Sequence, residues 1–364
     1  MVDLAIFLMD LGGGGAERVM INLAHGFAEC KLNVDLVLVK PEGPYLSQIS
    51  PQINLVHLKS SRLILSLPSL VRYLEENQPK VLLSALEDTN FVALWARKLA
   101  NVSTKVVVTV HNHLSQEAEN ATSFKRRMTP TLVKWFYPLA DRVIAVSEGV
   151  AKNLIELGVP SEKTTWIYNP IVSKEMLEKL QEPVSHPWLL PNQPPVILGV
   201  GRLTKQKDFA TLIRAFAQVK QEYPAKLIIL GEGNEQKNLT NLVLELNLTE
   251  DVVFPGFVAN PYSYMAHASV LVLSSAWEGF GNVLVEAMAA GTPVVSTDCE
   301  SGPAEILAQG KYGKLVPVGN VESMAQAILT TLKNPPNSNI LKQRSEDFSL
   351  TNAIIKYQEV LKIR

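Results

Sequence analysis

Short apolar runs alternate with longer stretches of helical periodicity along almost the whole chain. The runs stand at residues 4–9, 34–39, 81–84, 106–110, 142–146, 196–200, 227–230, 252–254, 270–273, 294–296 and 314–316. Because these runs are apolar throughout, they predict strands of parallel sheets that are buried on both faces by helices. The clearest helices are expected to begin near Asp208 and Asn320. The pattern predicts an α/β fold.

A proline-rich segment divides this pattern into two halves. Six prolines lie between Asn169 and Pro195, a density that interrupts helices and sheet interiors. We therefore expect two doubly wound, Rossmann-like domains, which suits a chain of 364 residues. Ligands of such sheets bind beyond the carboxyl ends of the strands, so the two halves are expected to face each other across a cleft.

Composition excludes several classes of protein. The net charge of −1 excludes a global nucleic-acid footprint, and two cysteines cannot build a disulfide framework. No apolar run reaches the roughly 18 residues of a membrane span, and Asp3 stands where a signal peptide has basic residues. We expect a soluble, cytoplasmic protein.

The first apolar run leads into four glycines, Gly12–Gly15, and then into a helical pattern. A glycine-rich turn at a helix N-terminus lets backbone N–H groups approach a phosphate. The spacing of a dinucleotide fold is missing because Glu17 stands at its third glycine position, and no lysine follows as in a phosphate-binding loop of NTPases. The alternative is a tight turn that packs strand on helix.

His111 follows the fourth run, at the expected carboxyl end of a buried parallel strand. Such a histidine can donate to a substrate hydroxyl or polarise a reacting group. His113 lies two residues on, but no carboxylate or cysteine cluster completes a metal site nearby. A structural role for His111 is the alternative.

Two basic residues follow the strand at 196–200 in the second half. Arg202 and Lys207 are five residues apart on a loop that leads into a helix, so both can reach one diphosphate. Two fixed cations stabilise the charge that develops on a leaving phosphate without a metal. A solvated charge run is the alternative.

Residues 274–291 contain two acids among glycines and aromatic residues. A short helix is expected to begin near Gly281 or Asn282 and to stop at Gly291, with N–H groups at its start that can bind phosphate. Glu278 precedes this helix and Glu286 lies about one turn into it. A pair of carboxylates for hydrolysis is suggested but not established by this spacing, and a capped core helix is the alternative.

A basic segment, Lys125, Arg126 and Arg127, precedes Trp135 and other apolar residues in the first half. This combination suits anionic headgroups at a membrane interface, and an ordinary helix with a solvated basic edge is the alternative. Residues 63–70 are a second, poorer candidate for membrane contact.

Together these residues resemble glycosyltransferase family 4, whose members are retaining, nucleotide-sugar-dependent enzymes of the GT-B fold. The resemblance covers nearly the whole chain. It is carried by His111 and by residues 12–17, 201–216, 231–233, 256–257 and 274–307.

The resemblance implies a role for each matching residue on the donor side. Arg202 and Lys207 would hold the donor diphosphate. Glu286 would bind the ribose, and Glu278 would contact the transferred sugar. His111 would touch that sugar from the N-terminal domain. Backbone groups are expected to assist at the phosphates at Gly14, Gly15, Gly281, Asn282 and Val283. The backbone at Phe257 is expected to lie along the nucleobase.

The resemblance also implies the domain organisation and the reaction. Residues 1–170 would form an acceptor-side domain and 171–348 a nucleotide-sugar-binding domain, with a last helix in 349–364 that packs back on the first domain. No cofactor and no obligatory metal are expected, and the leaving phosphate would assist deprotonation of the acceptor in a front-face mechanism.

The resemblance favours transfer of a hexose from a UDP-sugar, with N-acetylhexosamines among the candidates. The acceptor would be a saccharide or a polyprenyl-diphosphate-linked saccharide in polysaccharide assembly, with peripheral binding to the inner face of the plasma membrane as an open option. The alternatives are a GDP-mannose-dependent mannosyltransferase, a nucleotide-sugar epimerase, a sugar phosphorylase and a donor-binding subunit without turnover.

Overall fold

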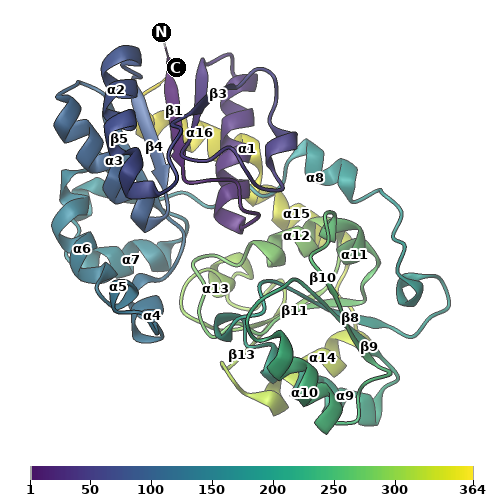
Figure 1. Cartoon of the computed structure of the whole chain (residues 1–364). Helices are drawn as coiled ribbons and strands as arrows, with labels where there is room; N and C mark the ends of the chain where they lie inside the picture. Colours follow the sequence, from purple (N-terminus) through teal and green to yellow (C-terminus); the bar gives the residue numbers. More distant parts are fainter. Residues whose placement is uncertain (1, 364) are drawn as a thin grey trace. The chain divides into compact units, whose positions relative to one another are not determined.

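The computed structural model describes residues 2–363, which divide into two compact units (Figure 1). Unit 1 contains the residues up to Pro170 together with those from Leu350 onward, and unit 2 contains Ile171–Ser349. Each unit is built on one sheet, and in the part of the chain that the structure describes the neighbouring strands of both sheets pair in parallel. The predicted α/β architecture of helix-covered parallel sheets is therefore confirmed.

Unit 1 has a seven-stranded sheet in the order β3-β2-β1-β4-β5-β6-β7. Its strands are β1 (Leu4–Leu8), β2 (Val34–Leu38), β3 (Asn54–His57), β4 (Val81–Ala85), β5 (Lys105–Val110), β6 (Arg142–Ala145) and β7 (Thr164–Trp166). The central strands are buried throughout because helices cover both faces. The edge strands β3 and β7, which the apolar pattern did not predict, are short. Strand β3 is largely exposed and β7 is half-buried.

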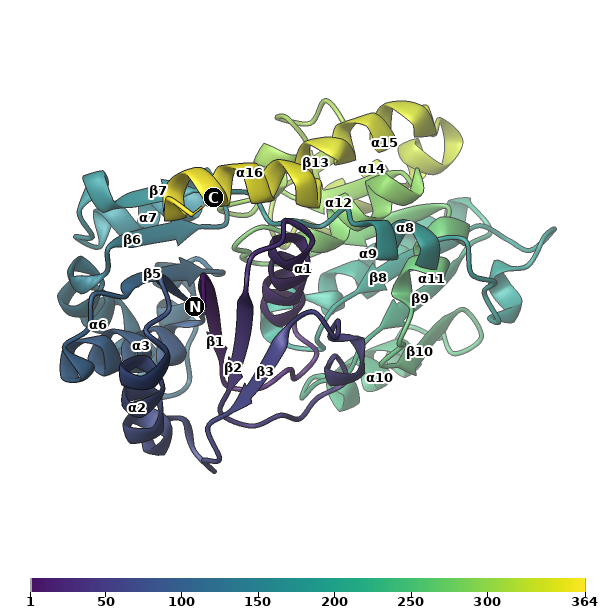
Figure 2. The ribbon, with the colours of Figure 1, turned by 90° about the horizontal axis from the view of Figure 1, so that it is seen from above.

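The helices of unit 1 lie on both sides of its sheet. They are α1 (Gly15–Glu29), α2 (Leu67–Asn77), α3 (Glu87–Ala100), α4 (Leu114–Glu119), α5 (Phe124–Arg127), α6 (Thr129–Phe136), α7 (Glu148–Glu156) and α16 (Leu350–Leu361), with 3-10 turns η1 (Leu46–Gln48), η2 (Leu63–Ser66), η3 (Tyr137–Leu139) and η4 (Ser161–Lys163). Figure 2 shows α1 beside α16 on one side of the sheet, and α2, α3 and α6 on the other. None of the described helices is both long enough and apolar enough to cross a membrane.

Unit 2 has a six-stranded sheet in the order β10-β9-β8-β11-β12-β13. Its strands are β8 (Val196–Val200), β9 (Lys226–Leu230), β10 (Val252–Gly256), β11 (Val270–Leu273), β12 (Val294–Thr297) and β13 (Lys314–Val316). Its helices are α8 (Lys174–Lys179), α9 (Phe209–Glu222), α10 (Gln236–Glu245), α11 (Pro261–His267), α12 (Asn282–Ala290), α13 (Pro303–Ile306), α14 (Val321–Lys333) and α15 (Ser338–Ser345), with η5 (Pro187–Leu189), η6 (Lys205–Lys207) and η7 (Glu346–Phe348). Helix α9 packs against α14, and α12 against α15.

The two helices predicted most clearly begin where their capping residues stand. Asp208 accepts a hydrogen bond from the Thr211 N–H at the start of α9, and Asn320 accepts one from the Ser323 N–H at the start of α14. Such side chains satisfy backbone donors that have no partner inside the helix. The apolar stripes of both helices enter one buried cluster with β8, β9 and β11.

Helix α16 completes the core of unit 1 although it follows all of unit 2 in the sequence. The Tyr357 ring meets the Phe27 ring of α1 edge-on, with 6.4 Å between centroids. Gly26 leaves room for this contact, since a Cβ there would lie 2.8 Å from Ile354 side-chain carbons. The first unit is therefore assembled from residues at both extremes of the described chain.

Replacing Tyr357 with Ala should destabilise unit 1 by about 3–5 kcal/mol, because it removes a fully buried aromatic ring and leaves a cavity. Chemical denaturation followed by circular dichroism measures this. Ile355→Ala is the matched control, because Ile355 lies on the same helix and is exposed. An equal effect of both substitutions would contradict the packing role of α16.

Candidate functional site

The carboxyl ends of β8 and β11 form the switch point of the sheet of unit 2. These strands are neighbours, and the chain leaves β8 toward β9 but leaves β11 toward β12, in the opposite direction across the sheet. Ligands of open α/β sheets bind at such points. Arg202 and Lys207 lie in the loop after β8, and Glu278 lies in the loop after β11.

The structure brings Lys207 and Glu278 together as an ion pair between Nζ and Oε1. The Ser275 hydroxyl donates to the same carboxylate oxygen at 2.6 Å, and Glu278 is buried. The Ser274 hydroxyl donates to the Lys207 carbonyl at 2.7 Å, and the Gln206 amide donates to the Trp277 carbonyl at 3.0 Å. The two loops are thus tied together by both side chains and backbone.

Ser275 and Gln206 are supporting residues that sequence reasoning missed. Ser275 stands three residues before Glu278, so the sequence alone could have identified its hydroxyl as a hydrogen-bond donor to that acid. Gln206 is separated from Trp277 by 71 residues, and only the pairing of β8 with β11 makes them neighbours.

Cys299, in the loop after β12, lies in the same buried environment. Burial, with the Glu278 carboxylate as a further cause, raises the pKa of its thiol to about 12. The thiol is therefore neutral at physiological pH, and only the thiolate is a strong nucleophile.

Helix α12 begins and ends at the predicted glycines. Gly281 is its N-cap in a left-handed conformation with φ 98°, which glycine adopts without steric cost, and Gly291 is the C-cap with φ 85°. Asn282 and Val283 form the first turn, where the helix dipole favours an anion. Glu286 is buried in the next turn.

Arg202 and Phe257 lie at the same edge of the sheet but are exposed. The Arg202 side chain forms no ion pair with any of the residues that the structure describes, and it is not brought into the Lys207–Glu278 contact. Phe257 follows β10, and its N–H donates to Glu232 Oε1 at 3.4 Å. A diphosphate and a nucleobase are the groups that such an exposed cation and ring can meet.

The side chains of Asp10 and Tyr45 hold the glycine loop of unit 1 in place. The Gly12 N–H donates to Asp10 Oδ1 at 3.0 Å, and the Tyr45 hydroxyl donates to the Gly13 carbonyl at 3.0 Å. Gly14 is the N-cap of α1, and Gly15 is its first residue. The loop thus ends at a helix N-terminus, as the sequence predicted.

His111 lies at the carboxyl end of β5, with its Nε2 2.9 Å from the Thr109 hydroxyl. That hydroxyl donates to the Ser84 carbonyl at 3.0 Å, so its oxygen is left to accept from an Nε2–H. Burial lowers the pKa of His111 to about 4. The ring is therefore neutral at pH 7, and its Nδ1 is an acceptor rather than a donor. His113 caps α4, where it accepts from the Gln116 N–H.

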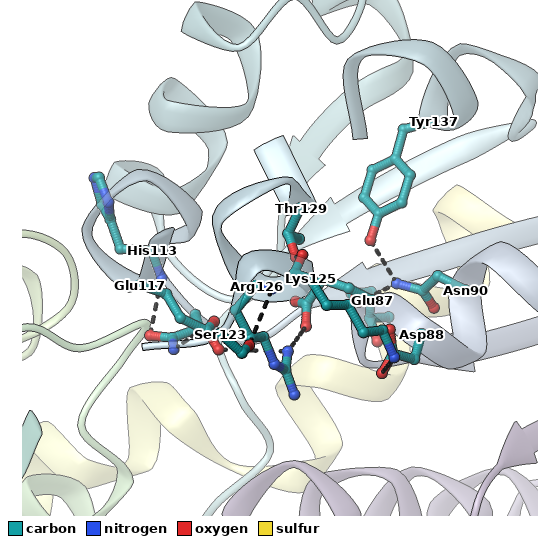
Figure 3. A network of polar contacts seen from close by, with 12 residues as sticks. Glu87, Asp88, Asn90, His113, Glu117, Ser123, Lys125, Arg126, Thr129 and Tyr137 are labelled. Atoms are coloured by element: carbon teal, nitrogen blue, oxygen red, sulfur yellow. Dashed lines mark hydrogen bonds and ion pairs between the residues drawn. The ribbon is translucent and has the colours of Figure 1, made fainter. Parts of the chain in front are cut away.

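The basic segment is engaged by carboxylates of unit 1 (Figure 3). Lys125 Nζ lies 2.7 Å from Asp88 Oδ2. Arg126 lies 3.5 Å from Glu87 and 3.4 Å from Glu117. Arg127 is exposed, and its Nε donates to the Ala121 carbonyl at 2.9 Å.

Glu87 is a second residue of note that sequence reasoning missed. It follows β4, which pairs with β1 at the switch point of the sheet of unit 1, and it is only 4% exposed. Burial raises its pKa to about 7, with the like charge of Glu117 as the next cause. An acid three residues after the apolar run at 81–84 was the signal that could have identified it.

Among residues 2–363, no group of three His, Cys, Asp or Glu side chains is arranged to hold a metal ion. The absence of an obligatory metal stays a prediction.

Known proteins resemble this chain over its whole described length. The model of the family described as Glycosyltransferase Family 4 matches residues 13–175, and the one described as Glycosyl transferases group 1 matches residues 181–348. The chain is 34% identical over 346 residues to a Campylobacter jejuni protein, with 92% of this chain and 91% of that protein covered. That protein is named N-acetylgalactosamine-N,N'-diacetylbacillosaminyl-diphospho-undecaprenol 4-alpha-N-acetylgalactosaminyltransferase.

Solved structures share the fold. Anabaena HepE in complex with UDP-glucose superimposes with a TM-score of 0.81 at 23% identity, over 100% of both chains. Sucrose-phosphate synthase from Thermosynechococcus elongatus gives a TM-score of 0.82 at 23% identity, over 100% of this chain and 98% of that one. These similarities confirm the predicted pair of Rossmann-like domains.

Replacing Glu87 with Gln should flatten the pH dependence of stability. The folded-state pKa of about 7 exceeds the ordinary value of 4.5, so the folded state binds more protons and stability falls as pH rises through this window. Gln cannot lose a proton, so the melting temperature of the variant should fall less than that of the wild type between about pH 5 and pH 8. Calorimetry across this range measures the difference.

Glu76→Gln on α2 is the control for this prediction, because Glu76 is exposed and should leave the pH dependence unchanged. Parallel melting curves for Glu87→Gln and the wild type would show that Glu87 does not titrate in this window.

Proposed function

Because the chain belongs to glycosyltransferase family 4 and is a glycosyltransferase of the GT-B fold, we propose that it transfers a sugar from a UDP-sugar to a lipid-linked saccharide with retention of configuration. The observation that carries this proposal is the contact of Lys207 with Glu278 at the switch point of unit 2. In this contact the Lys207 cation can stabilise a leaving phosphate, and the Glu278 carboxylate can accept hydrogen bonds from sugar hydroxyls.

Lys207 and Arg202 are proposed to hold the donor diphosphate. The Lys207 ammonium is oriented by Glu278, which limits the reorganisation required when charge develops on the leaving phosphate. Arg202 is exposed in the same loop and forms no ion pair with a described residue, so its guanidinium is available for a bidentate contact. The N-terminus of α12, with Gly281, Asn282 and Val283, adds the partial positive charge of the helix dipole.

The remaining contacts with the nucleotide-sugar are proposed from the positions of the residues at the strand ends of each unit. Glu286 is proposed to accept from the ribose hydroxyls, and Phe257 to lie along the base through its backbone. In unit 1, Gly14 and Gly15 are proposed to approach the phosphates. His111 is proposed to accept a hydrogen bond from a sugar hydroxyl through Nδ1, since its Nε2 is engaged by Thr109.

The reaction proposed here exchanges one C–O bond for another and moves one proton. The acceptor hydroxyl oxygen attacks the anomeric carbon on the face from which UDP departs, through an oxocarbenium-like transition state. The bond to the β-phosphate oxygen breaks with its electron pair, and the departing phosphate takes the acceptor proton. Lys207 and Arg202 stabilise the charge on that phosphate, so the step has no chemical need for a metal.

The donor and acceptor classes draw support from relatives. The name of the Campylobacter jejuni protein specifies an N-acetylgalactosaminyl group and a diphospho-undecaprenol saccharide. Solved complexes of Anabaena HepE contain UDP, with glucose or as UDP-glucose. We therefore favour a UDP-N-acetylhexosamine donor, a polyprenyl-diphosphate-linked acceptor and a site of action on the cytoplasmic side of the membrane.

Lys125, Arg126 and Arg127 are proposed to contact the acceptor diphosphate. Since Lys125 and Arg126 are ion-paired with Asp88, Glu87 and Glu117, an acceptor would have to compete with these carboxylates. Arg127 has no ion pair with a described residue and is the readiest of the three to meet a phosphate.

Replacing Lys207 with Ala should lower turnover by about 10²–10³-fold, because the leaving phosphate loses its fixed cation. Sugar transfer or slow donor hydrolysis measures the effect, and circular dichroism checks the fold. Lys205→Ala is the matched control, since Lys205 is exposed in the same 3-10 turn. Near-normal activity of Lys207→Ala would remove this residue from the leaving-group site.

The donor should be identified by binding to a panel of UDP-, GDP- and ADP-sugars with EDTA present. We expect one UDP-sugar to bind and to release trace sugar without acceptor, because the proposed site holds the diphosphate with side chains alone. Calorimetry and product chromatography give both results. Binding of GDP-sugars instead would reject the donor proposed here, and activity only with added metal would reject the metal-independent step.

A further inference from the structure

The Glu278 carboxylate receives both of its hydrogen bonds on the same oxygen. The Lys207 ammonium and the Ser275 hydroxyl both contact Oε1, the hydroxyl at 2.6 Å. Among residues 2–363, no group donates to the second oxygen, Oε2. Although the side chain is only 7% exposed, Oε2 is not one of the fully covered polar atoms that lack a partner, so part of its surface is accessible. The carboxylate is therefore held at one oxygen and open at the other.

The open oxygen of Glu278 can only accept hydrogen bonds. A carboxylate in an ion pair has no proton to donate. A ligand group that meets Oε2 must therefore carry an O–H or N–H, as sugar hydroxyls and amides do. A phosphate oxygen is an acceptor with negative charge, so the same atom repels it. The direction in which Oε2 points thus determines whether this carboxylate meets the sugar of a nucleotide-sugar.

The two contacts on Oε1 differ in how well they resist a bound diphosphate. Lys207 is 17% exposed and is proposed to bind that diphosphate, so its ammonium would then be shared between two anions, and its hold on Glu278 would weaken. Ser275 is fully buried, and its single O–H is directed at Oε1. A diphosphate cannot reach this hydroxyl, so the contact of Ser275 with Glu278 persists when Lys207 engages the donor.

Ser275 is itself fixed by the neighbouring strands. The Thr297 hydroxyl of β12 donates to the Ser275 carbonyl at 2.6 Å, and Thr297 is fully buried. On the other side, the Ser274 hydroxyl donates to the Lys207 carbonyl in the loop after β8. Because β11 lies between β8 and β12, the start of its loop is held from both sides. The hydroxyl of Ser275 is therefore in place before a ligand binds.

We propose that Ser275 is a positioning residue for recognition of the transferred sugar. It keeps Oε1 of Glu278 occupied, so that Oε2 is directed at a hydroxyl of that sugar while Lys207 engages the diphosphate. Ser275 does not touch the donor and acts only through Glu278. The inference rests on the proposed function, which it deepens by naming the residue that makes recognition of the sugar separable from recognition of the nucleotide.

Calorimetric binding of two probes to the full chain tests the inference. The probes are UDP and UDP-N-acetylgalactosamine, or the UDP-sugar that the donor panel selects in its place. Ser275→Ala should weaken binding of the UDP-sugar about tenfold, because Glu278 loses a charge-assisted hydrogen bond that orients it. UDP offers no sugar to Glu278, so its affinity should be unchanged.

A double-mutant cycle separates positioning from a general structural role. In the Glu278→Ala background, Ser275→Ala should cause no further loss of affinity for the UDP-sugar, because the group on which Ser275 acts is gone. A loss of the same size in both backgrounds would overturn the positioning role. An equal loss of affinity for UDP and for the UDP-sugar in the single variant would overturn it as well.

Two further variants complete the experiment. Ser275→Cys has a similar shape and a weaker donor, so its affinity for the UDP-sugar should lie between those of the wild type and Ser275→Ala. If Ser275→Ala does not fold by circular dichroism, the Cys variant carries the test, and wild-type affinity for the UDP-sugar would then overturn the inference.

Ser263→Ala is the matched control, because Ser263 is a buried serine of α11 whose hydroxyl donates to the Asn260 carbonyl at 3.1 Å. It should leave both affinities unchanged.

The inference and the proposed function fail in different ways. A wild type that binds neither UDP nor any UDP-sugar would reject the proposed donor and the inference with it. A wild type that binds both probes, together with a Ser275→Ala variant of equal affinity for both, would overturn the role of Ser275 alone and leave the proposed function in place.

Discussion

Parallel pairing of β8 with both β9 and β11 is the constraint on which the candidate site of unit 2 depends. In a parallel sheet every strand ends at the same edge, so loops that are distant in the sequence are placed side by side. Lys207 and Glu278 are 71 residues apart and meet only because their strands are neighbours. A slip in this register would separate the two charges and leave the Glu278 carboxylate buried without its cation, which is costly in a protein interior.

Unit 1 uses the same constraint with a different electrostatic result. Glu87 follows the strand that pairs with β1, as Glu278 follows the strand that pairs with β8. Glu278 has a cation and a hydroxyl in direct contact, whereas Glu87 has Arg126 at 3.5 Å and Glu117 nearby as a like charge. Burial therefore dominates at Glu87, and its pKa rises toward neutrality. Position at the switch point brings acids into both sites, and the local partners decide their charge.

The sequence predicted what depends on local pattern and left out what depends on long-range pairing. The interior strands and the caps of α9, α12 and α14 follow from apolar runs, Asp208, Asn320 and the two glycines around 282–290. The strands β3 and β7 were missed because neither carries an apolar run: β3 is mostly exposed and β7 is half-buried at the edge of the sheet. The partners of the basic segment were also not predictable, since Arg126 and Glu87 are 39 residues apart and lie on different helices.

The return of α16 to unit 1 has a consequence for the order of events during synthesis. All of unit 2 leaves the ribosome before α16 does, and domains generally fold as units while the chain is still being made. Unit 2 can therefore reach its native state while α1 of unit 1 still exposes the apolar surface around Phe27 that Tyr357 later covers. For that interval the nascent first unit is incomplete, and chaperone binding to it is expected to end when α16 is added.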